Sequence, residues 1–140
     1  MYVSVMDAKW HVALKALLYA TLAGVFVLAL LPADVRLPDA FAISDVLNHG
    51  LAFVVISILF DLAYPALGVL AKIGVITAYG GAIEIAQSFT PTRECSLGDL
   101  AVDCAATLLF FAASRAAAHL LFSKRSCLVK RSALLRPGSR

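Results

Sequence analysis

The chain has 140 residues, of which 61% are hydrophobic and 15% are charged, with 12 Lys and Arg against 9 Asp and Glu and a mean hydropathy of +0.89. A soluble domain of this length has too little interior to hide so much apolar surface, and a disordered chain would be far more polar. These numbers exclude both classes and predict a small polytopic membrane protein.

Four apolar runs each approach the ~20 residues that a helix needs to cross a bilayer, and they lack the alternation of barrel strands. We predict membrane-spanning helices at residues 11–31, 45–64, 66–88 and 98–122. The first run is longer than the core of a cleaved signal peptide and is interpreted as an uncleaved span. The predicted fold class is an all-α membrane protein, an antiparallel four-helix bundle that forms one domain over residues 1–122.

The end of the chain is basic and holds no acidic residue over residues 123–140. Positively charged segments beside spans stay in the cytoplasm, so we interpret these residues as a basic cytoplasmic tail rather than a nucleic-acid-binding segment. Four spans then place both termini in the cytoplasm. The loops 32–44 and 89–97 face outward in this topology.

Three spans carry pairs of polar residues at their outer ends, three or four positions apart and therefore on one helix face. The pairs are Asp45 with His49, Glu84 with Gln87, and Asp99 with Asp103, and the short outer loop adds Arg93. Ionisable groups inside spans are costly and usually functional. We therefore predict an outward-facing polar pocket, with Glu84, Asp99 and His49 as the acid–base candidates and the remaining four as binding residues.

Most of these residues also have a structural interpretation, which the sequence leaves open. Asp45 and Asp99 are placed to cap helix N-termini. Gln87 can hydrogen-bond a neighbouring helix, and Glu84 can form an ion pair with Arg93.

Four other charged or titratable residues lie toward the inner ends of the spans and are interpreted as boundary residues: Asp61, Lys72, Arg115 and His119. We expect Lys72 to extend its ammonium back to the membrane surface.

Small residues near the pocket predict close helix packing. Gly80 and Gly81 precede Glu84 by about one turn, and the small surface expected to match them on the fourth span is Ala101, Ala105 and Ala106.

The cofactor requirement is left unknown by the sequence. The three cysteines, Cys95, Cys104 and Cys127, form no CxxC pair and predict neither a zinc site nor a disulfide framework. If a divalent metal joins the carboxylates, oxygen ligands favour Mg²⁺, Mn²⁺ or Ca²⁺.

The polar residues follow an ordered pattern. It reads Asp45-x-x-x-His49 and then Phe53, followed by Tyr79-Gly80-x-x-x-Glu84-x-x-Gln87 and by Pro91-x-Arg93-x-x-Ser96-x-x-Asp99. Over residues 44–110 this pattern resembles the VanZ-like family of small bacterial membrane proteins. The chain departs from the family pattern at Asp103, where Asn is common, at Ala106, where Gly is common, and at Val46, where Lys is usual.

The resemblance implies an integral protein of the bacterial inner membrane that is associated with the cell envelope. The founding members are linked to reduced susceptibility to the glycopeptide teicoplanin, so the resemblance also implies an effect on glycopeptide susceptibility. It assigns no reaction.

Three functions are compatible with these residues. The favoured one is a site for an envelope precursor, a lipid-linked glycan or its phosphate head group, in which Arg93 holds an anionic oxygen and Glu84 or Asp99 acts as acid or base. The next is a structural or assembly subunit, and the last is a small proton-coupled transporter, which would need a homo-oligomer. The sequence does not decide whether the protein is an enzyme. The expected partners are the lipid bilayer and the lipid-linked precursor, and no nucleic acid.

Overall fold

The structure is a computed structural model. It describes the backbone of residues 2–32, 45–91 and 95–134, and the side chains of residues 9–32, 46–91 and 95–121.

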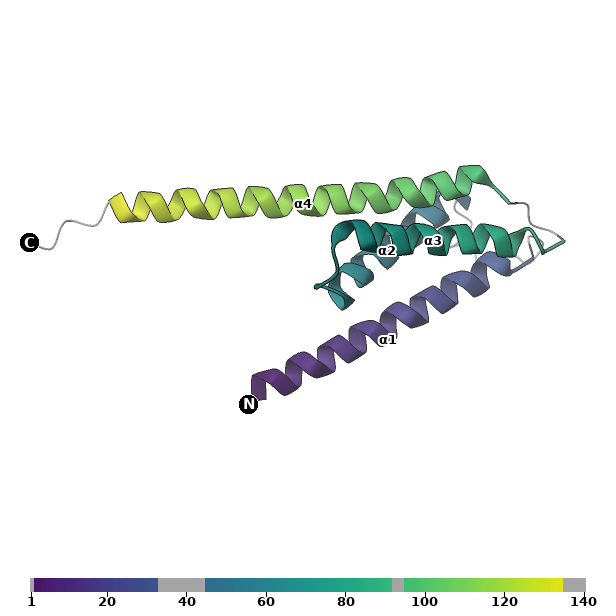
Figure 1. Ribbon diagram of the computed structural model, residues 1–140, viewed down its shortest axis with the longest axis horizontal. Coiled ribbons are helices and arrows are strands. Elements are labelled where there is room, and N and C mark those ends of the chain that lie inside the picture. Colours follow the sequence, from purple (N-terminus) through teal and green to yellow (C-terminus); the bar gives the residue numbers. More distant parts are fainter. Residues whose placement is uncertain (1, 33–44, 92–94, 135–140) are drawn as a thin grey trace, which may run out of the picture. The chain divides into compact units, whose positions relative to one another are not determined.

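The described residues form four helices and no strand (Figure 1). They are α1 (Tyr2–Leu30), α2 (Asp45–Ala63), α3 (Val69–Gln87) and α4 (Leu97–Leu134). Each helix contains a stretch of between 18 and 25 residues that is apolar enough to cross a membrane. At ~1.5 Å per residue, such stretches match the ~30 Å hydrocarbon core of a bilayer. The predictions of an all-α class and of four membrane-length helices are confirmed.

A proline turn separates α2 from α3 and moves the start of α3 three residues beyond the predicted residue 66. The Leu67 N–H donates to the Tyr64 carbonyl oxygen at 3.1 Å, with Pro65 at the second position of the turn. Proline is favoured there because its φ is already set for a turn. Gly68 follows as the N-cap, with an extended backbone at φ −63° and ψ 148°.

Side-chain hydroxyls satisfy the end of α3. The Ser88 hydroxyl donates to the Ile85 carbonyl oxygen at 2.7 Å, and the Thr90 hydroxyl donates to the Gln87 carbonyl oxygen at 2.7 Å. The last four carbonyl groups of a helix have no partner within the helix. These bonds therefore end α3 cleanly, just before Pro91.

α4 continues past the predicted end of the fourth span and reaches Leu134. Lys and Arg favour helix, so part of the predicted basic tail extends the helix. The chain divides into two compact units, residues 1–110 and residues 111–140. Arg115 and His119 belong to the second unit, where both are exposed. Every residue of the site described below belongs to the first unit.

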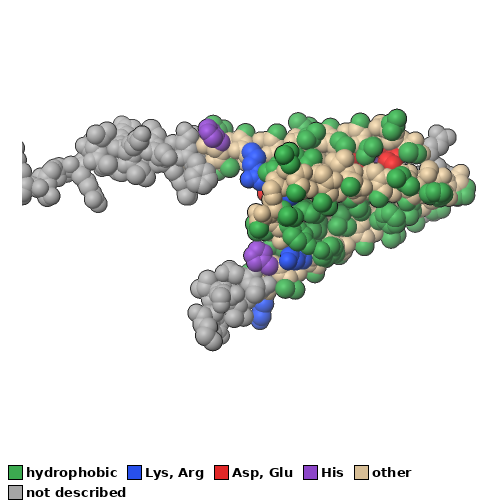
Figure 2. Space-filling model, viewed as in Figure 1, with side chains coloured by type: hydrophobic (Ala, Val, Ile, Leu, Met, Phe, Trp, Pro, Cys, Tyr) green, Lys and Arg blue, Asp and Glu red, His purple; other side chains and the backbone are tan. Residues whose placement is uncertain are grey.

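The first unit buries polar side chains and exposes apolar ones. The buried polar residues are Ser57, Lys72, Glu84, Gln87, Asp103 and Thr107. Leu70 is 85% exposed and Leu109 is 70% exposed, and Figure 2 shows apolar side chains over much of the visible face of α1 to α4 within this unit. Water would penalise so much exposed apolar surface, whereas lipid would not. The pattern therefore fits a multi-pass membrane protein.

Two hydrogen bonds attach α3 to the backbone of α1. The Tyr79 hydroxyl donates to the Leu22 carbonyl oxygen at 2.6 Å, and the Gln87 amide donates to the Ala29 carbonyl oxygen at 3.0 Å. Later residues of α3 meet later residues of α1, so these two helices run in the same direction.

The structure corrects the prediction for Lys72. Its side chain is 1% exposed, and its ammonium donates to the Asp61 carboxylate of α2 instead of extending to the surface. A buried ammonium without a partner is strongly disfavoured. The facing carboxylate supplies that partner within the first turn of α3, which makes extension unnecessary.

Candidate functional site

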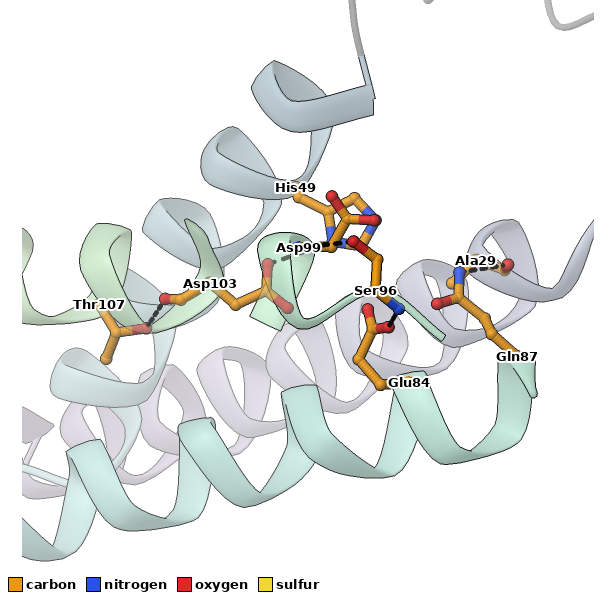
Figure 3. A network of polar contacts seen from close by, with 8 residues as sticks. All are labelled: Ala29, His49, Glu84, Gln87, Ser96, Asp99, Asp103 and Thr107. Carbon is orange, nitrogen blue, oxygen red and sulfur yellow. Dashed lines mark hydrogen bonds and ion pairs between the residues drawn. The ribbon is translucent and has the colours of Figure 1, made fainter. Parts of the chain in front are cut away.

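Three helices each place one titratable side chain in a common cluster at the end of the first unit where α3 ends and α4 begins (Figure 3). His49 lies in the second turn of α2, Glu84 in the last turn of α3, and Asp103 in the second turn of α4. Each therefore lies only about one or two turns from a helix end. We refer to His49, Glu84 and Asp103 as the polar cluster.

The atoms of the polar cluster lie close together. His49 Nδ1 is 3.2 Å from Asp103 Oδ1. One nitrogen or oxygen of each of His49, Glu84 and Asp103 can be chosen so that all three atoms lie within 4.8 Å of one another. Glu84 is 2% exposed and Asp103 is fully buried, whereas His49 is partly exposed. The cluster is therefore a largely enclosed site that His49 connects to the surface of the unit.

Glu84 is positioned by the start of α4. The Ser96 backbone N–H donates to Glu84 Oε2 at 2.7 Å, and the Ser96 hydroxyl accepts the Asp99 backbone N–H at 3.1 Å. Ser96 thus caps α4 through its side chain, as in a capping box. In that motif an acid of the same helix bonds the N-cap amide, but here Glu84 from α3 does so. One cap consequently joins two helices.

Two carboxylate oxygens of the polar cluster have no hydrogen-bond partner among the described residues. They are Glu84 Oε1 and Asp103 Oδ2, and both atoms are buried. A buried polar group without a partner costs about 1–3 kcal/mol, and more when it is charged. The cluster therefore has free acceptors that a hydrogen-bond donor or a cation would satisfy.

A close helix contact encloses Asp103. A β-carbon added at Gly80 would lie 3.1 Å from Asp103 Oδ2 and 3.2 Å from the Phe53 ring. An added methyl group would fit only if the carboxylate or the ring shifted by a few tenths of an ångström. The prediction of close packing at Gly80 is confirmed, whereas nothing lies within 4 Å of a β-carbon added at Gly81.

The prediction that alanines of the fourth span form the surface that packs against these glycines is wrong. Ala101 and Ala105 are exposed, and Ala106 is only partly buried. The side chain of Asp103 meets α3 instead, because the rotation of α4 about its axis brings that residue, and not the alanines, against Gly80.

The remaining predicted site residues fall into different places. Gln87 is buried, but its amide donates to Ala29 of α1, away from the polar cluster (Figure 3). Asp99 lies in the first turn of α4, where its carboxylate complements the helix dipole. Arg93 and the side chain of Asp45 lie outside the described residues.

Sequence reasoning did not assign a site role to Ser96. Its signal was present, because Ser-x-x-Asp before an apolar run is the sequence form of a capping box. Phe53 belongs to the ordered sequence pattern, but no local feature of the sequence indicates that its ring packs against Gly80. The described cysteines, Cys95 and Cys104, are free thiols.

Comparison with known proteins does not identify the chain. No protein-family model, curated protein or solved structure matches it.

The chemistry of the polar cluster is acidic and suited to cations or to hydrogen-bond donors. Two of its three side chains are carboxylates, and Asp103 Oδ1 lies 3.2 Å from His49 Nδ1. An ionised carboxylate can accept hydrogen bonds but cannot donate them, while an imidazole can donate or accept. Among the described residues, the cluster offers no fixed positive group that would attract an anion.

Proposed function

We propose that this is a VanZ-like protein of the bacterial inner membrane that binds or acts on the polar part of a lipid-linked envelope component at the polar cluster. The observation that supports this most is the pair of buried, unpartnered carboxylate oxygens on Glu84 and Asp103, beside the His49 imidazole. Ionisable groups inside membrane helices are usually functional, and these three converge from three separate helices.

The proposed topology is an antiparallel four-helix bundle with both termini in the cytoplasm. The basic residues after the fourth span support this orientation. The polar cluster then lies within about two turns of the outer membrane–water interface, at the depth of a lipid head group.

The ligand chemistry follows from the free acceptors. Unpartnered carboxylate oxygens call for hydroxyl or ammonium donors, and a glycan head group is rich in hydroxyls. Arg93, in the adjacent loop of the sequence, supplies a guanidinium for a phosphate oxygen. In an enzymatic version, His49 is the proton-transfer group and Asp103 holds its ring in place, since a carboxylate bonded to one ring nitrogen orients the other.

The decisive experiment is native mass spectrometry of the full chain after gentle extraction, comparing wild type with Glu84→Gln and Thr107→Val. Thr107 is a matched control because it is buried, lies one turn beyond Asp103, and donates its hydroxyl to the Asp103 carbonyl oxygen of its own helix at 2.9 Å. We expect a polyprenyl-phosphate or lipid-linked glycan species on wild type and on Thr107→Val, and its loss from Glu84→Gln. No such species on wild type, or equal retention by both variants, would overturn the proposal.

A structural or assembly role is the second candidate, because the Ser96–Glu84 and His49–Asp103 contacts also tie helices together. It predicts that Glu84→Gln lowers the amount of folded protein in the membrane. The envelope proposal instead predicts normal insertion and altered glycopeptide susceptibility of expressing cells. Quantitative immunoblotting beside a teicoplanin susceptibility assay separates the two.

A further inference from the structure

We infer that His49, Glu84 and Asp103 form a binding site for one divalent first-row transition-metal ion of the Zn²⁺ type. The inference rests on the same cluster as the proposed function, but ion binding is measurable without any envelope ligand. In the metal-bound protein, the ion would fill the free acceptors of the cluster.

The donor atoms are suited to one ion. His49 Nδ1 and Asp103 Oδ1 are 3.2 Å apart, close to the ~3.4 Å expected between two ligands of a tetrahedral ion at about 2.1 Å from each. The proton that these atoms share is thus the group that the ion would replace, as when metal binding displaces protons from its ligands. One ligand atom of each of the three residues lies within 4.8 Å of the other two, and a separation of that size needs to shorten by about 1.4 Å to reach ~3.4 Å, which side-chain rotation can supply.

The unpartnered oxygens are an independent sign that this is a cation site. Glu84 Oε1 and Asp103 Oδ2 are buried without a hydrogen bond among the described residues, on side chains that are 2% and 0% exposed. Buried charges in proteins are paired or coordinate metals. Two carboxylates also balance the charge of a divalent ion, which matters most in the low dielectric of a membrane interior.

The surroundings hold the ligands in place. The Ser96 backbone N–H donates to Glu84 Oε2 and leaves Oε1 free, in the manner of an outer-shell bond that orients a ligating carboxylate. Gly80 and Phe53 enclose Asp103 from the other side.

The imidazole decides the ion class. From the carboxylates alone the sequence favoured Mg²⁺, Mn²⁺ or Ca²⁺, but those hard ions prefer oxygen ligands. A nitrogen beside two carboxylate oxygens favours Zn²⁺ and its neighbours. Three protein ligands leave a coordination position open, as in catalytic rather than structural zinc sites.

The test uses the full chain in detergent, stripped with a chelator and equilibrated with Zn²⁺, followed by elemental analysis and calorimetric titration. The variants are Glu84→Gln, Asp103→Asn and His49→Gln, with Thr107→Val as the polar control and Cys95→Ser with Cys104→Ser as the thiol control. Circular dichroism melting shows which variants fold. We expect about one Zn²⁺ per wild-type chain. In each folded ligand variant the affinity for Zn²⁺ should fall by more than the about 10–100-fold that is typical of outer-shell changes. The controls should bind Zn²⁺ as the wild type does.

Co²⁺ substitution supplies a second readout that does not depend on any variant folding. We expect visible ligand-field absorption without a thiolate charge-transfer band. Three results would each overturn the inference. They are Zn²⁺ binding that is unchanged in all folded ligand variants, displacement of Zn²⁺ by an equal concentration of Mg²⁺ or Ca²⁺, and a thiolate charge-transfer band. Stoichiometric Zn²⁺ binding with no bound envelope lipid would support the metal site and contradict only the proposed function. A bound envelope lipid with no Zn²⁺ binding would support the proposed function and contradict only the metal site.

Discussion

The two ends of α3 both bury charged side chains, yet they bury them differently. Near its start, Lys72 meets the Asp61 carboxylate, and one positive charge faces one negative charge. Near its end, the polar cluster brings together two carboxylates and an imidazole, with two oxygens unpartnered among the described residues. In the first arrangement the two charges balance each other. In the second, the two free oxygens would be satisfied only by a bound cation or hydrogen-bond donor. Charge balance and satisfied bonds therefore distinguish a structural tie from a candidate site.

The largest effect is expected where the complete pair is broken. Asp61→Asn would leave the Lys72 ammonium buried without its counter-charge. Breaking a buried pair costs about 3–5 kcal/mol, and we expect the lower end because Asp61 is 30% exposed. The free energy of unfolding in detergent micelles, followed by circular dichroism, measures this.

The control for that variant removes both charges together. Asp61→Leu with Lys72→Met should recover most of the lost stability, since apolar replacement of a buried pair is often neutral. A double variant as unstable as the single one would show that the pair is not the tie we describe.

The next effect concerns the packing that encloses Asp103. Gly80→Ala places a methyl group against the Asp103 carboxylate and the Phe53 ring, and we expect a loss of about 1–3 kcal/mol from overpacking together with weaker Zn²⁺ binding. Gly81→Ala is the matched control, because open space surrounds that position. It should be neutral or stabilise the helix by up to about 1 kcal/mol. Equal behaviour of the two variants in thermal melting would contradict the close contact.

The polar cluster should respond to neutralisation in the opposite sense to the Lys72 pair. In metal-free protein, Glu84→Gln removes a buried charge while its side-chain carbonyl can still accept the Ser96 N–H. We expect a gain of about 1 kcal/mol, within the range for relieving an unsatisfied buried group, alongside loss of Zn²⁺ binding. The same melting experiment measures it, and a loss comparable to that of Asp61→Asn would make Glu84 a structural residue.

The smallest effect is expected at the cap that joins α3 to α4. Ser96→Ala removes the hydroxyl that accepts the Asp99 N–H but keeps the backbone bond to Glu84. Loss of such a cap costs about 1 kcal/mol. Ser96→Thr should restore it, and unchanged melting of Ser96→Ala would show that the hydroxyl does not cap α4.

The lengths and hydropathy of the apolar runs made the four helices predictable. Apolar runs of membrane length define helices almost regardless of their neighbours, because lipid leaves the backbone no other way to satisfy its hydrogen bonds. The bounds of these runs also placed His49, Glu84 and Asp103 near helix ends correctly. The unusual presence of ionisable groups in spans drew attention to them.

Only the tertiary structure decided which of these residues meet. The bond of Gln87 to α1, the burial of Lys72, and the contact of Asp103 with Gly80 all depend on how each helix is rotated against its neighbours. A rotation of one residue step, about 100°, would turn Asp103 away and bring another residue to Gly80. The sequence by itself determined that this is a helical membrane protein with polar residues at its helix ends. The packing of the helices turned three of them into one site, because the rotational register of neighbouring helices is set by side-chain contacts that no single segment contains.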